Sequence, residues 1–576
     1  MERVEIPFFR EEGFFRKKCK VCGSYFWTLD DQMETCMDAP CSEYTFIGSS
    51  PAKRRMELRE VREAFLRFFE ERGHRRIRPY PVVARWRDDL YFTIASIVDF
   101  QPYVTSGEMP PPANPLVVSQ PCLRFEDIDR VGPTAGRHLT IFEMGGHHAF
   151  NSETEYVYWA DETVRLHHEL LTKVFGVPQE LIAYKEGFWS GGGNAGPDLE
   201  ASVGGLEVST LVFMQYRVVD GSLEPNPLRV VDTGYGMERW CWLTTGDPTA
   251  FHSVYGSLID KLYCWSGFPK PDTRLLSEYF RASGIYVEQL PYSLEAVKKI
   301  SKKIGADFEE LLSVTTTLEA ICASLDHTKA LAFLLAEGVV PSNVREGYLA
   351  RLLLRRLYRF LRMILLEDRL VDILDLQFKM WSEDFPHLVE MKEEALEIAS
   401  HEVKKYLETL RRGTRIVNKV IGPMLKGLDS RRQRRIDMLM ISRDGTENKS
   451  KFGANSIIAT SIAVAKAAAS TYGMQLFQYI GGVSACTLPV PLMNIINGGK
   501  HAGNELAIQE FMIVPVGSDK FTEALRIGCE VYYELKEYLK EKYGRSAVNV
   551  GDEGGFSPPM KKTREALDAL VKTIER

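Results

Sequence analysis

The chain has 576 residues and a formal net charge of −6, with 72 Lys and Arg against 78 Asp and Glu. Hydrophobic residues make up 45% and charged residues 26%, which is typical of globular proteins and excludes disordered and fibrous classes. Because the charges nearly balance, any nucleic-acid site must depend on a local patch. The length predicts three to five domains at about 100–200 residues each.

The composition changes near residue 420. Residues 421–576 contain 21 Lys and Arg against 17 Asp and Glu, a net charge of +4, whereas the preceding residues carry −10. All 8 Trp lie between Trp27 and Trp381. This contrast indicates that two different proteins have been joined in one chain.

The sequence predicts a soluble cytoplasmic protein with no membrane partner. The N-terminus lacks the basic and apolar pattern of a signal peptide. The most apolar run, 456–470, is interrupted by Lys466 and is too short to cross a bilayer. The 10 Cys do not form the framework of a disulfide-rich protein, so we expect reduced thiols.

The type of predicted element changes along the chain. Leu58, Val61, Phe65, Phe68 and Phe69 share one helical face, which predicts an amphipathic helix over 57–73. Short β-type runs between 79 and 245 predict a mostly antiparallel sheet, and the region 250–412 has the periodicity of long helices. The expected strands include 115–119, 139–142, 209–216 and 228–231, and the expected long helices include 287–304, 315–338, 346–368 and 389–412.

Beyond residue 415 the predicted elements alternate between strands and helices. An Ala-rich helix is expected over 455–472 and a second helix over 522–543. Apolar strands are expected over 490–496, 510–516 and 547–551. This alternation is typical of part of a parallel barrel or a doubly wound sheet.

Four cysteines lie close together in the sequence, in the pattern Cys19-x2-Cys22-x13-Cys36-x4-Cys41. Two close pairs of thiolates can supply the four ligands of a tetrahedral zinc ion at little loop-closure cost. Because sulfur would fill all four positions, such a zinc would be structural. The alternative is a set of free cysteines buried in the fold.

Three segments combine arginines, glycines and aromatic residues: 121–144, 187–193 and 231–239. Arginines on neighbouring strands can clamp a polyphosphate, and an Arg opposite a Phe can enclose a purine. An Asp beside glycines can hold an ammonium group. Taken singly, each Arg also fits an ordinary salt bridge, and Gly191–Gly193 also fits a flexible turn.

Together these segments resemble the archaeal-type alanyl-tRNA synthetases over about residues 5–412. The resemblance depends on the strings Tyr80–Asp89, Phe142–Asn151, Leu211–Tyr216 and Val231–Arg239. It implies an α+β fold, in which a class II antiparallel sheet with flanking helices precedes an α-helical tRNA-binding domain. It also implies activation of alanine by ATP with Mg²⁺, followed by transfer to tRNA(Ala).

The resemblance also implies roles for individual residues. Arg124, Asp232 and Arg239 would be the catalytic residues, with Asp232 holding the α-ammonium group of alanine. Trp189 and Gly234 would shape the alanine pocket. The ATP-binding residues would be Arg124, Arg137, His138, Phe142 and Arg239, of which Phe142 and Arg239 would enclose adenine. The loop 131–137 is one residue longer than is usual in the family.

Several arginines gather on one flank of the helix expected over 346–368. They are Arg351, Arg355, Arg356, Arg359 and Arg362. A basic stripe within an acidic region suits a phosphate backbone, although a solvated helix face is the common alternative. By resemblance, this region contacts the tRNA acceptor stem, and Asn343 matches the residue that probes a G·U pair. A structural role is expected for Asp326-His327-Thr328.

From about residue 416 the chain resembles an internal slice of enolase. The strongest strings are Leu488–Ala502, Gln509–Ile513 and Gly551–Phe556. The residues that match enolase site positions are His501, Gln509, Glu510 and Glu553. Because the family's metal ligands and proton-abstracting Lys are missing, we expect this fragment to be inactive. About three of the eight barrel strands cannot close a barrel, so we expect the fragment alone to be poorly folded. The basic run 431–435 is expected to be a solvated helix face.

The predicted domains are a zinc-binding segment (1–50), a class II catalytic domain (51–250), a helical acceptor-stem domain (251–413) and an incomplete α/β enolase-type barrel fragment (414–576). No synthetase editing domain or C-terminal dimerisation region is expected. The main functional hypothesis is an alanine–tRNA ligase. The alternatives are a residual 2-phosphoglycerate lyase and a non-catalytic RNA-binding protein.

Overall fold

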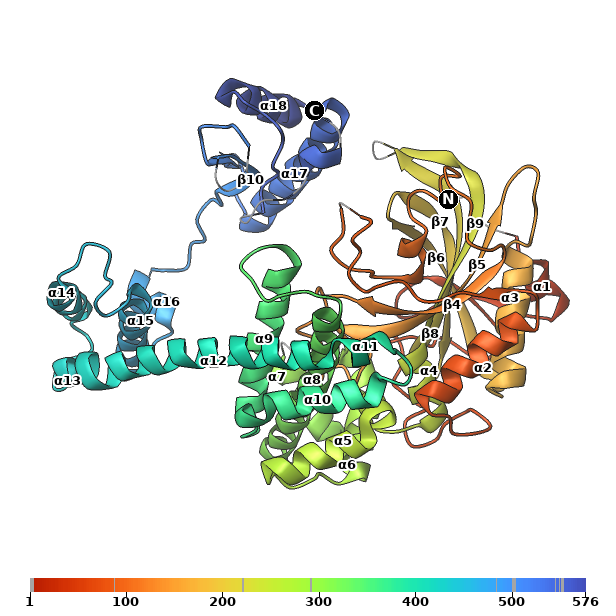
Figure 1. Ribbon diagram of the computed structural model, residues 1–576, viewed down its shortest axis with the longest axis horizontal. Coiled ribbons are helices and arrows are strands. Elements are labelled where there is room, and N and C mark those ends of the chain that lie inside the picture. Colours follow the sequence, from red (N-terminus) through yellow and green to blue (C-terminus); the bar gives the residue numbers. More distant parts are fainter. Residues whose placement is uncertain are drawn as a thin grey trace. The chain divides into compact units, whose positions relative to one another are not determined.

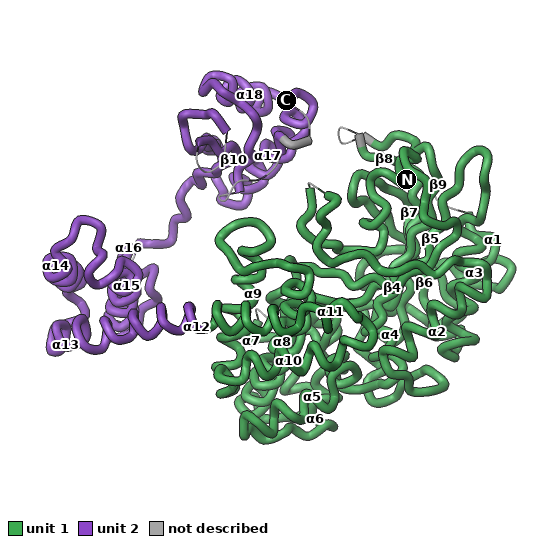
Figure 2. Tube along the Cα trace, in the orientation of Figure 1, with its two compact units in different colours: residues 1–403 green, residues 404–576 purple. Residues whose placement is uncertain are grey.

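The computed structural model describes the chain apart from residues 1–4, 88, 220–221, 291–292, 483, 500–503, 544, 549 and 551–553. The chain divides into two compact units, Met1–Val403 and Lys404–Arg576 (Figure 2). Within the described ranges, no helix has both the length and the apolar character needed to span a bilayer.

Unit 1 is built around one large sheet, whose nine strands in the described chain lie in the order β1-β2-β6-β7-β8-β9-β5-β4-β3 (Figure 1). The neighbouring strands pair antiparallel, except that β3 and β4 are parallel. The antiparallel sheet predicted from the sequence is therefore confirmed. The strands are β1 (Phe15–Lys18), β2 (Tyr25–Thr28), β3 (Arg75–Arg76), β4 (Leu116–Leu123), β5 (Ile141–Asn151), β6 (Ile182–Gly191), β7 (Asn194–Val203), β8 (Leu206–Val219) and β9 (Ser222–Gly236).

Helix α2 (Leu58–Glu70) confirms the predicted amphipathic helix. The backbone N–H of Glu57 donates to the Glu60 side chain at 2.9 Å and so helps to cap the first turn. The predicted apolar face is buried, and the ring centroid of Phe65 lies 4.8 Å from that of Tyr235 in β9. Packing against the sheet therefore fixes this helix. Three other short helices of this part are α1 (Pro7–Glu11), α3 (Ala160–Glu169) and α4 (Met237–Thr245).

A helical region follows the sheet and surrounds the central helix α8 (Phe308–Ala336). Residues 320–336 of α8 are buried on every face, because α5, α7, α9, α10 and α11 all pack against it. The expected long helices are present, but the helix expected over 287–304 begins only at Leu294. The flanking helices are α5 (Ala250–Ser266), α6 (Thr273–Ser283), α7 (Leu294–Ile304), α9 (Arg345–Met363), α10 (Leu370–Trp381), α11 (His387–Glu390) and α12 (Lys392–Ile416).

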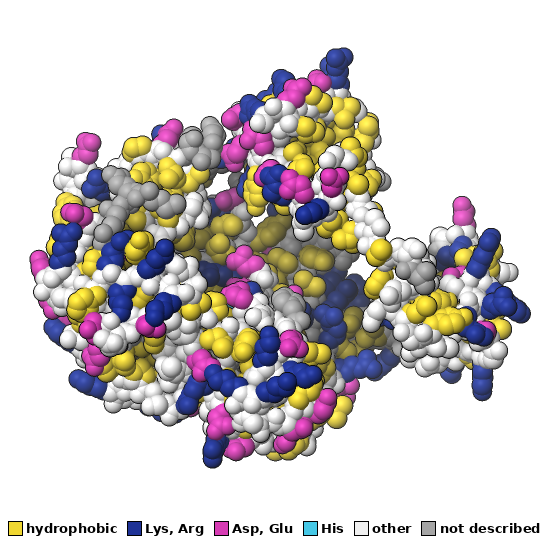
Figure 3. Space-filling view, turned by 180° about the vertical axis from the view of Figure 1, so that it is seen from behind, with side chains coloured by type: hydrophobic (Ala, Val, Ile, Leu, Met, Phe, Trp, Pro, Cys, Tyr) yellow, Lys and Arg dark blue, Asp and Glu magenta, His cyan; other side chains and the backbone are white. Residues whose placement is uncertain are grey.

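Unit 2 contains helices and one short pair of strands. The described elements are α13 (Gly422–Leu425), α14 (Gln433–Asp444), α15 (Ala454–Thr471), α16 (Leu476–Gly481), β10 (Met493–Asn497), β11 (Glu510–Ile513), α17 (Phe521–Tyr543) and α18 (Thr563–Glu575). The arginines of the run 431–435 are exposed at the start of α14, as expected for a solvated face, and basic side chains lie on the surface of the α13–α16 bundle (Figure 3).

Among the described residues, the expectation of parallel strands in unit 2 holds only at an isolated parallel bridge between Ile496 and Phe556, because β10 and β11 pair antiparallel. A parallel pair is usually joined by an α-helix, and the described part of the twelve-residue connection 498–509 contains no α-helix. The strand expected over 547–551 is instead a 3₁₀ turn, Arg545–Val548, followed by an isolated bridge at Val550.

Within the whole chain, the enolase-like fragment has buried apolar clusters of its own. Apolar residues of the two strands and of α17 and α18 form a buried core that includes Ile496, Phe511, Leu535 and Leu570. A second buried cluster joins Ile421, Ile436 and Met440 with neighbouring residues. The fragment nevertheless leaves large apolar side chains exposed, among them Ile480 at 70% and Val516 at 78%.

Candidate active site

The residues predicted to bind ATP and alanine lie around one cavity of about 290 Å³ in unit 1. They come from four separate parts of the chain, which the antiparallel register of β4, β5, β6 and β9 brings together. This size is close to the lower end of the range for small-molecule sites. The predicted residues that line the cavity are Arg124, Arg137, His138, Phe142, Trp189, Asp232, Gly234 and Arg239.

Arg124 lies directly after β4 and faces an aromatic ring of β5. Its Nε donates to the carbonyl oxygen of Ile94 at 2.9 Å, and its guanidinium carbon lies 5.0 Å from the centroid of Phe142. One cation is thus held against an aromatic face at the cavity wall. This arrangement provides a positive charge and a flat apolar surface side by side.

Arg239, in the first turn of α4, is oriented by two groups at the opposite wall. Its Nη1 lies 3.1 Å from both the backbone oxygen and a side-chain oxygen of Glu207, and its Nη2 donates to the backbone oxygen of Arg137 at 2.9 Å. Burial opposes ionisation of Glu207, but Arg239 and Arg137 outweigh it and lower the pKa of this carboxyl to about 2. Glu207 therefore stays charged at neutral pH.

Arg137 is a buried salt-bridge partner rather than a free cation. Its guanidinium binds both oxygens of Asp38, at 2.8 and 3.3 Å. Burial disfavours the charge, yet Asp38 raises the pKa of Arg137 above its usual value. The salt-bridge alternative for Arg137 is thus correct, although the pair lies at the cavity and not on the surface.

His138 is neutral, and both of its ring nitrogens contact protein groups. Burial, together with Arg239 and Arg137, lowers the pKa of His138 to about 3. Its Nδ1 lies 3.1 Å from the hydroxyl oxygen of Thr134, and its Nε2 lies 3.3 Å from Nη1 of Arg130. Because the Thr134 hydroxyl donates to a backbone oxygen, Nδ1 carries the proton and Nε2 accepts from Arg130.

Asp232, in the centre of β9, is the acidic group of the cavity that was predicted to hold an ammonium ion. Only 7% of it is exposed, and burial raises the pKa of this carboxyl to about 7. Nδ1 of the buried His148 lies 3.4 Å from its Oδ1. Gly234 follows on the same strand, where a β-carbon would lie 3.2 Å from the sulfur of Met144. The absence of a side chain there keeps this wall open.

Trp189 lies near the end of β6, just before a tight hairpin. Gly192 and Gly193 form this hairpin with φ angles of +56° and +85°, the positive values that two-residue turns require. The amide nitrogen of Gln101 donates to the backbone oxygen of Gly191 at 3.1 Å. The glycine run is therefore an ordered hairpin turn, rather than a flexible one, and it positions Trp189 at the cavity.

Several acidic residues of this site were not predicted from the sequence, among them Asp198, Glu200 and Glu207 in the cavity wall and Asp38 behind it. Asp198 is 7% exposed, and burial together with Glu200 raises its pKa to about 7. It lies opposite Val212, which in turn lies opposite Asp232, so the two carboxylates are two strands apart on one face of the sheet. Two acidic residues within one β-type run, Asp198 and Glu200, were the available signal.

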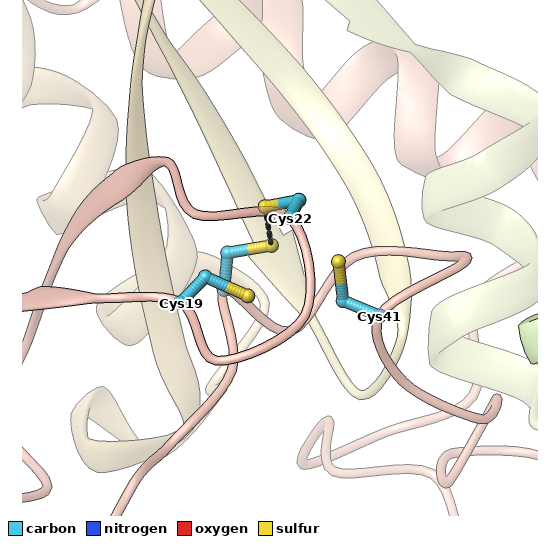
Figure 4. A group of neighbouring side chains, drawn as sticks. Cys19, Cys22 and Cys41 are labelled. Atoms are coloured by element: carbon cyan, nitrogen blue, oxygen red, sulfur yellow. Dashed lines mark hydrogen bonds between the residues drawn. The ribbon is translucent and has the colours of Figure 1, made fainter.

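The four predicted metal-ligating cysteines are brought together at the β1–β2 turn and the loop that follows. Their sulfur atoms all lie within 4.8 Å of one another, and those of Cys22 and Cys36 are 3.9 Å apart. Figure 4 shows the sulfurs of Cys19, Cys22 and Cys41 directed toward a common space. Tetrahedral zinc with sulfur at about 2.3 Å needs sulfurs about 3.8 Å apart, so the residues fit this ion.

The thiols of this cluster differ in their surroundings. Burial opposes ionisation of Cys19, but the backbone N–H groups of Cys22 and Val21 outweigh it and lower the pKa to about 6. At Cys41 burial dominates and raises the pKa to about 12. A thiolate at Cys19 is thus available at neutral pH to begin metal binding, after which the ion itself would favour the other thiolates.

The predicted tRNA-facing arginines fall into two groups. Arg355, Arg359 and Arg362 are exposed along α9. Arg351 instead binds Glu402 of α12 through two contacts, at 2.7 and 3.1 Å, and also donates to the exposed side chain of Asn343.

Arg356 also has partners within the protein. It forms an ion pair with Asp129 at 2.6 Å and contacts Nε2 of His327 at 3.3 Å. The buried Asp326 accepts from the backbone N–H of Thr140 at 2.9 Å. The structural role expected for Asp326 and His327 is therefore confirmed, and Arg356 belongs to the same joint between sheet and helices.

Of the enolase-like residues, His501 and Glu553 lie outside the described residues. Glu510 begins β11, opposite Asn497 of β10, and the backbone oxygen of Gln509 accepts from Gly498 at 2.8 Å. The structure thus places these two residues on a two-stranded ribbon.

Comparison with known proteins finds family matches in both parts of the chain. The family of class II (A) tRNA synthetases matches residues 60–432. The enolase N-terminal domain matches residues 389–480, and the enolase C-terminal TIM barrel domain matches residues 485–576. The enolase match begins before the expected residue 416 and overlaps the synthetase match.

Similar relatives are archaeal proteins named alanine–tRNA ligase. The one from Korarchaeum cryptofilum is 53% identical over 421 residues, which cover 73% of this chain and 47% of the relative. The one from Ignicoccus hospitalis is 50% identical over 421 residues, 72% of this chain and 46% of the relative. The one from Hyperthermus butylicus is 50% identical over 419 residues, 72% and 45% respectively. The chain thus spans less than half the length of these relatives.

Proposed function

The chain belongs to the class II (A) tRNA synthetases, and from this premise we propose that it activates alanine with ATP and transfers it to the 3′ end of tRNA(Ala). The observation that carries the proposal is the convergence of the predicted ATP-binding and alanine-binding residues on one cavity. The relatives that are about half identical are named alanine–tRNA ligase, which favours alanine as the amino acid.

In this proposal Arg124 and Arg239 bind the phosphates of ATP from two walls of the cavity. Arg124 also approaches the carboxylate of alanine, while Phe142 and Arg239 enclose the adenine ring. Both guanidinium groups are already oriented by protein oxygens, at 2.9–3.1 Å. Such preorganisation stabilises the charge that develops as alanine displaces pyrophosphate, without reorganisation during the reaction. No side chain has to act as a general base.

The alanine subsite is formed by Asp232, Trp189 and Gly234. A carboxylate at Asp232 binds the α-ammonium group, and Trp189 closes the space next to the amino-acid side chain. Val212, opposite Asp232 in the sheet, adds an apolar wall. A small pocket admits alanine, whereas larger side chains would clash with the ring of Trp189.

Mg²⁺ would accompany ATP and neutralise part of its phosphate charge. Glu207, Glu200 and Asp198 line the cavity and have the oxygen chemistry that this ion prefers. The four cysteines would hold a structural zinc ion. Its contribution is to fix the loop from 36 to 41 beside the sheet.

We further propose that α9 and the loop before it bind the acceptor stem of the tRNA. Arg355 and Arg359 supply phosphate contacts, and Asn343 probes a base pair in the minor groove. The side chain of Arg351 binds the oxygen of Asn343 and leaves its NH₂ group available as a donor.

Alanine-dependent exchange between ATP and pyrophosphate tests the activation step. We expect exchange with the native chain and its loss in Asp232→Ala, with the native circular dichroism spectrum retained. Exchange that does not depend on alanine in a folded protein would contradict the proposal. Charging of a minihelix with and without a G·U pair then tests the transfer step and separates a ligase from a non-catalytic RNA-binding protein.

A further inference from the structure

Asp38 connects the cysteine cluster with the ATP-facing arginines. It lies between Cys36 and Cys41 in the sequence, and only 6% of it is exposed. Its carboxylate binds Arg137 through two contacts, at 2.8 and 3.3 Å, and accepts from the backbone N–H of Glu207 at 3.2 Å. A residue of the cysteine loop therefore forms part of the wall behind the cavity.

The backbone of Asp38 is held by the cysteine loop itself. Its oxygen accepts from the N–H groups of Cys41 at 2.7 Å and Ser42 at 3.1 Å, and its own N–H bonds the sulfur of Cys36. On the other side, the N–H of Ala39 donates to the oxygen of Gly205 at 3.0 Å, just before β8. The conformation of the loop thus determines where the Asp38 carboxylate lies.

The two groups that Asp38 orients are the same two that hold Arg239. Arg137 accepts from Arg239 through its backbone oxygen, and Glu207 accepts through its backbone and side-chain oxygens. A continuous series of contacts therefore runs from the sulfur of Cys36, through Asp38, to the guanidinium of Arg239. The steps that follow Asp38 are hydrogen bonds or ion pairs of 3.3 Å or less.

We propose that Asp38 is a positioning residue through which metal occupancy of the four-cysteine cluster raises the affinity of the chain for ATP. The inference rests on the proposed function, because it assigns ATP to the cavity. With the metal bound, the loop is fixed, and Arg137 and Glu207 hold Arg239 in position for the phosphates. Without it, the four thiols no longer share a ligand, and the Asp38 carboxylate loses its fixed position.

The test measures ATP binding directly by calorimetry, with the zinc-loaded full chain and with the same chain after chelation. Three variants are compared with the native chain: Asp38→Asn, Asp38→Ala and the matched control Glu34→Gln. Glu34 lies in the same segment and loses the same charge, but it is exposed and pairs only with the exposed Lys20 among the described ion pairs.

We expect Asp38→Asn to weaken ATP binding by at least about fivefold while zinc content stays at one ion per chain, and Glu34→Gln to have no effect. Removing zinc should weaken ATP binding of the native chain by a similar factor, and should have little further effect in Asp38→Asn, because both changes break the same series of contacts. In exchange assays the KM for ATP should rise, with the KM for alanine unchanged.

Equal ATP affinity with and without zinc would overturn the inference, as would an additive effect of zinc removal in Asp38→Asn. If the Asp38 variants do not fold, the zinc dependence of the native chain still decides the question. If the ATP affinity does not depend on zinc or on Asp38 while alanine-dependent exchange is present, this inference is rejected and the proposed function stands. ATP binding without exchange would reject the proposed function alone.

Discussion

The ammonium group of Lys329 lies 3.1 Å from a carboxylate oxygen of Glu238, and both side chains are almost fully buried. This ion pair joins α8 of the helical region to α4, which follows the last strand of the sheet. The Glu238 carboxylate also accepts from the backbone N–H of Glu143 at 3.0 Å. Glu143 in turn binds Arg62 of α2 at 2.6 and 2.7 Å. Four elements around the active site, α2, β5, α4 and α8, thus meet in one buried charge network.

Replacing Lys329 with Met should destabilise the fold strongly. The variant would leave Glu238 charged, buried and without its cation, which typically costs about 3–5 kcal/mol. The double variant Lys329→Met with Glu238→Gln should recover most of this loss, because it removes both charges. Unfolding in urea measures the difference. A single variant as stable as the native chain would show that the pair does not hold the two regions together.

Alanine binding should weaken as the pH falls below about 7, because burial raises the pKa of Asp232 to about that value. The α-ammonium group binds the ionised carboxyl, so the KM for alanine should rise by up to about tenfold for each pH unit below the pKa. The KM for ATP serves as the internal control. A KM for alanine that is constant between pH 5.5 and 8 would exclude Asp232 as the ammonium-binding group.

The variant Asp232→Asn should lose exchange activity and yet be more stable than the native chain. The carboxyl ionises near pH 7 in the folded chain and near 3.9 when unfolded, so the native protein loses stability as the pH rises between these values. Asn removes this cost. The stabilisation, measured by urea unfolding, should therefore be larger at pH 8 than at pH 5, by on the order of 2 kcal/mol. An equal gain at both pH values would contradict this assignment.

Much of the site could be predicted because its residues lie in recognisable strings. The four cysteines and the cavity residues from Arg124 to Arg239 are together in space, as their motifs predict. The partner of Arg137 could not be predicted, since Asp38 is 99 positions away in the sequence and its loop is placed by contacts with the start of β8, including the bridge to Gly205. The antiparallel pairing of β10 and β11 in unit 2 could not be predicted either, because an alternation of strands and helices along the chain does not specify how two strands pair.

Spacing alone likewise could not separate the arginines of α9. The flank of α9 carries Arg355, Arg356 and Arg359. A turn of the helix by one residue about its axis would change which of these side chains meets Asp129 and His327. The surrounding helices, not the local sequence, select Arg356 for that contact. The basic stripe available to a ligand is therefore narrower than the sequence implies.

This division predicts different effects for two similar substitutions in α9. Arg359→Gln should weaken tRNA binding, lower the dependence of the binding constant on salt by about one unit of slope, and leave unfolding unchanged. Arg356→Gln should lower the free energy of unfolding, because it leaves His327 and Asp129 without this partner. Filter binding at several salt concentrations and urea unfolding measure both. Identical behaviour of the two variants would contradict the separation into exposed and internal arginines.

The contact between Arg351 and Glu402 predicts how much of the chain the synthetase function needs. Glu402 lies in α12 and binds the guanidinium that also binds Asn343. A chain that ends after Ile416, the last residue of α12, should therefore keep alanine-dependent exchange and G·U-dependent charging of a minihelix. In that shortened chain, Glu402→Gln should lower charging of the minihelix several-fold without changing exchange, because Asn343 loses its support while the ATP cavity is untouched. Loss of exchange on removal of residues 417–576 would instead show that the enolase-like part supports the catalytic sheet.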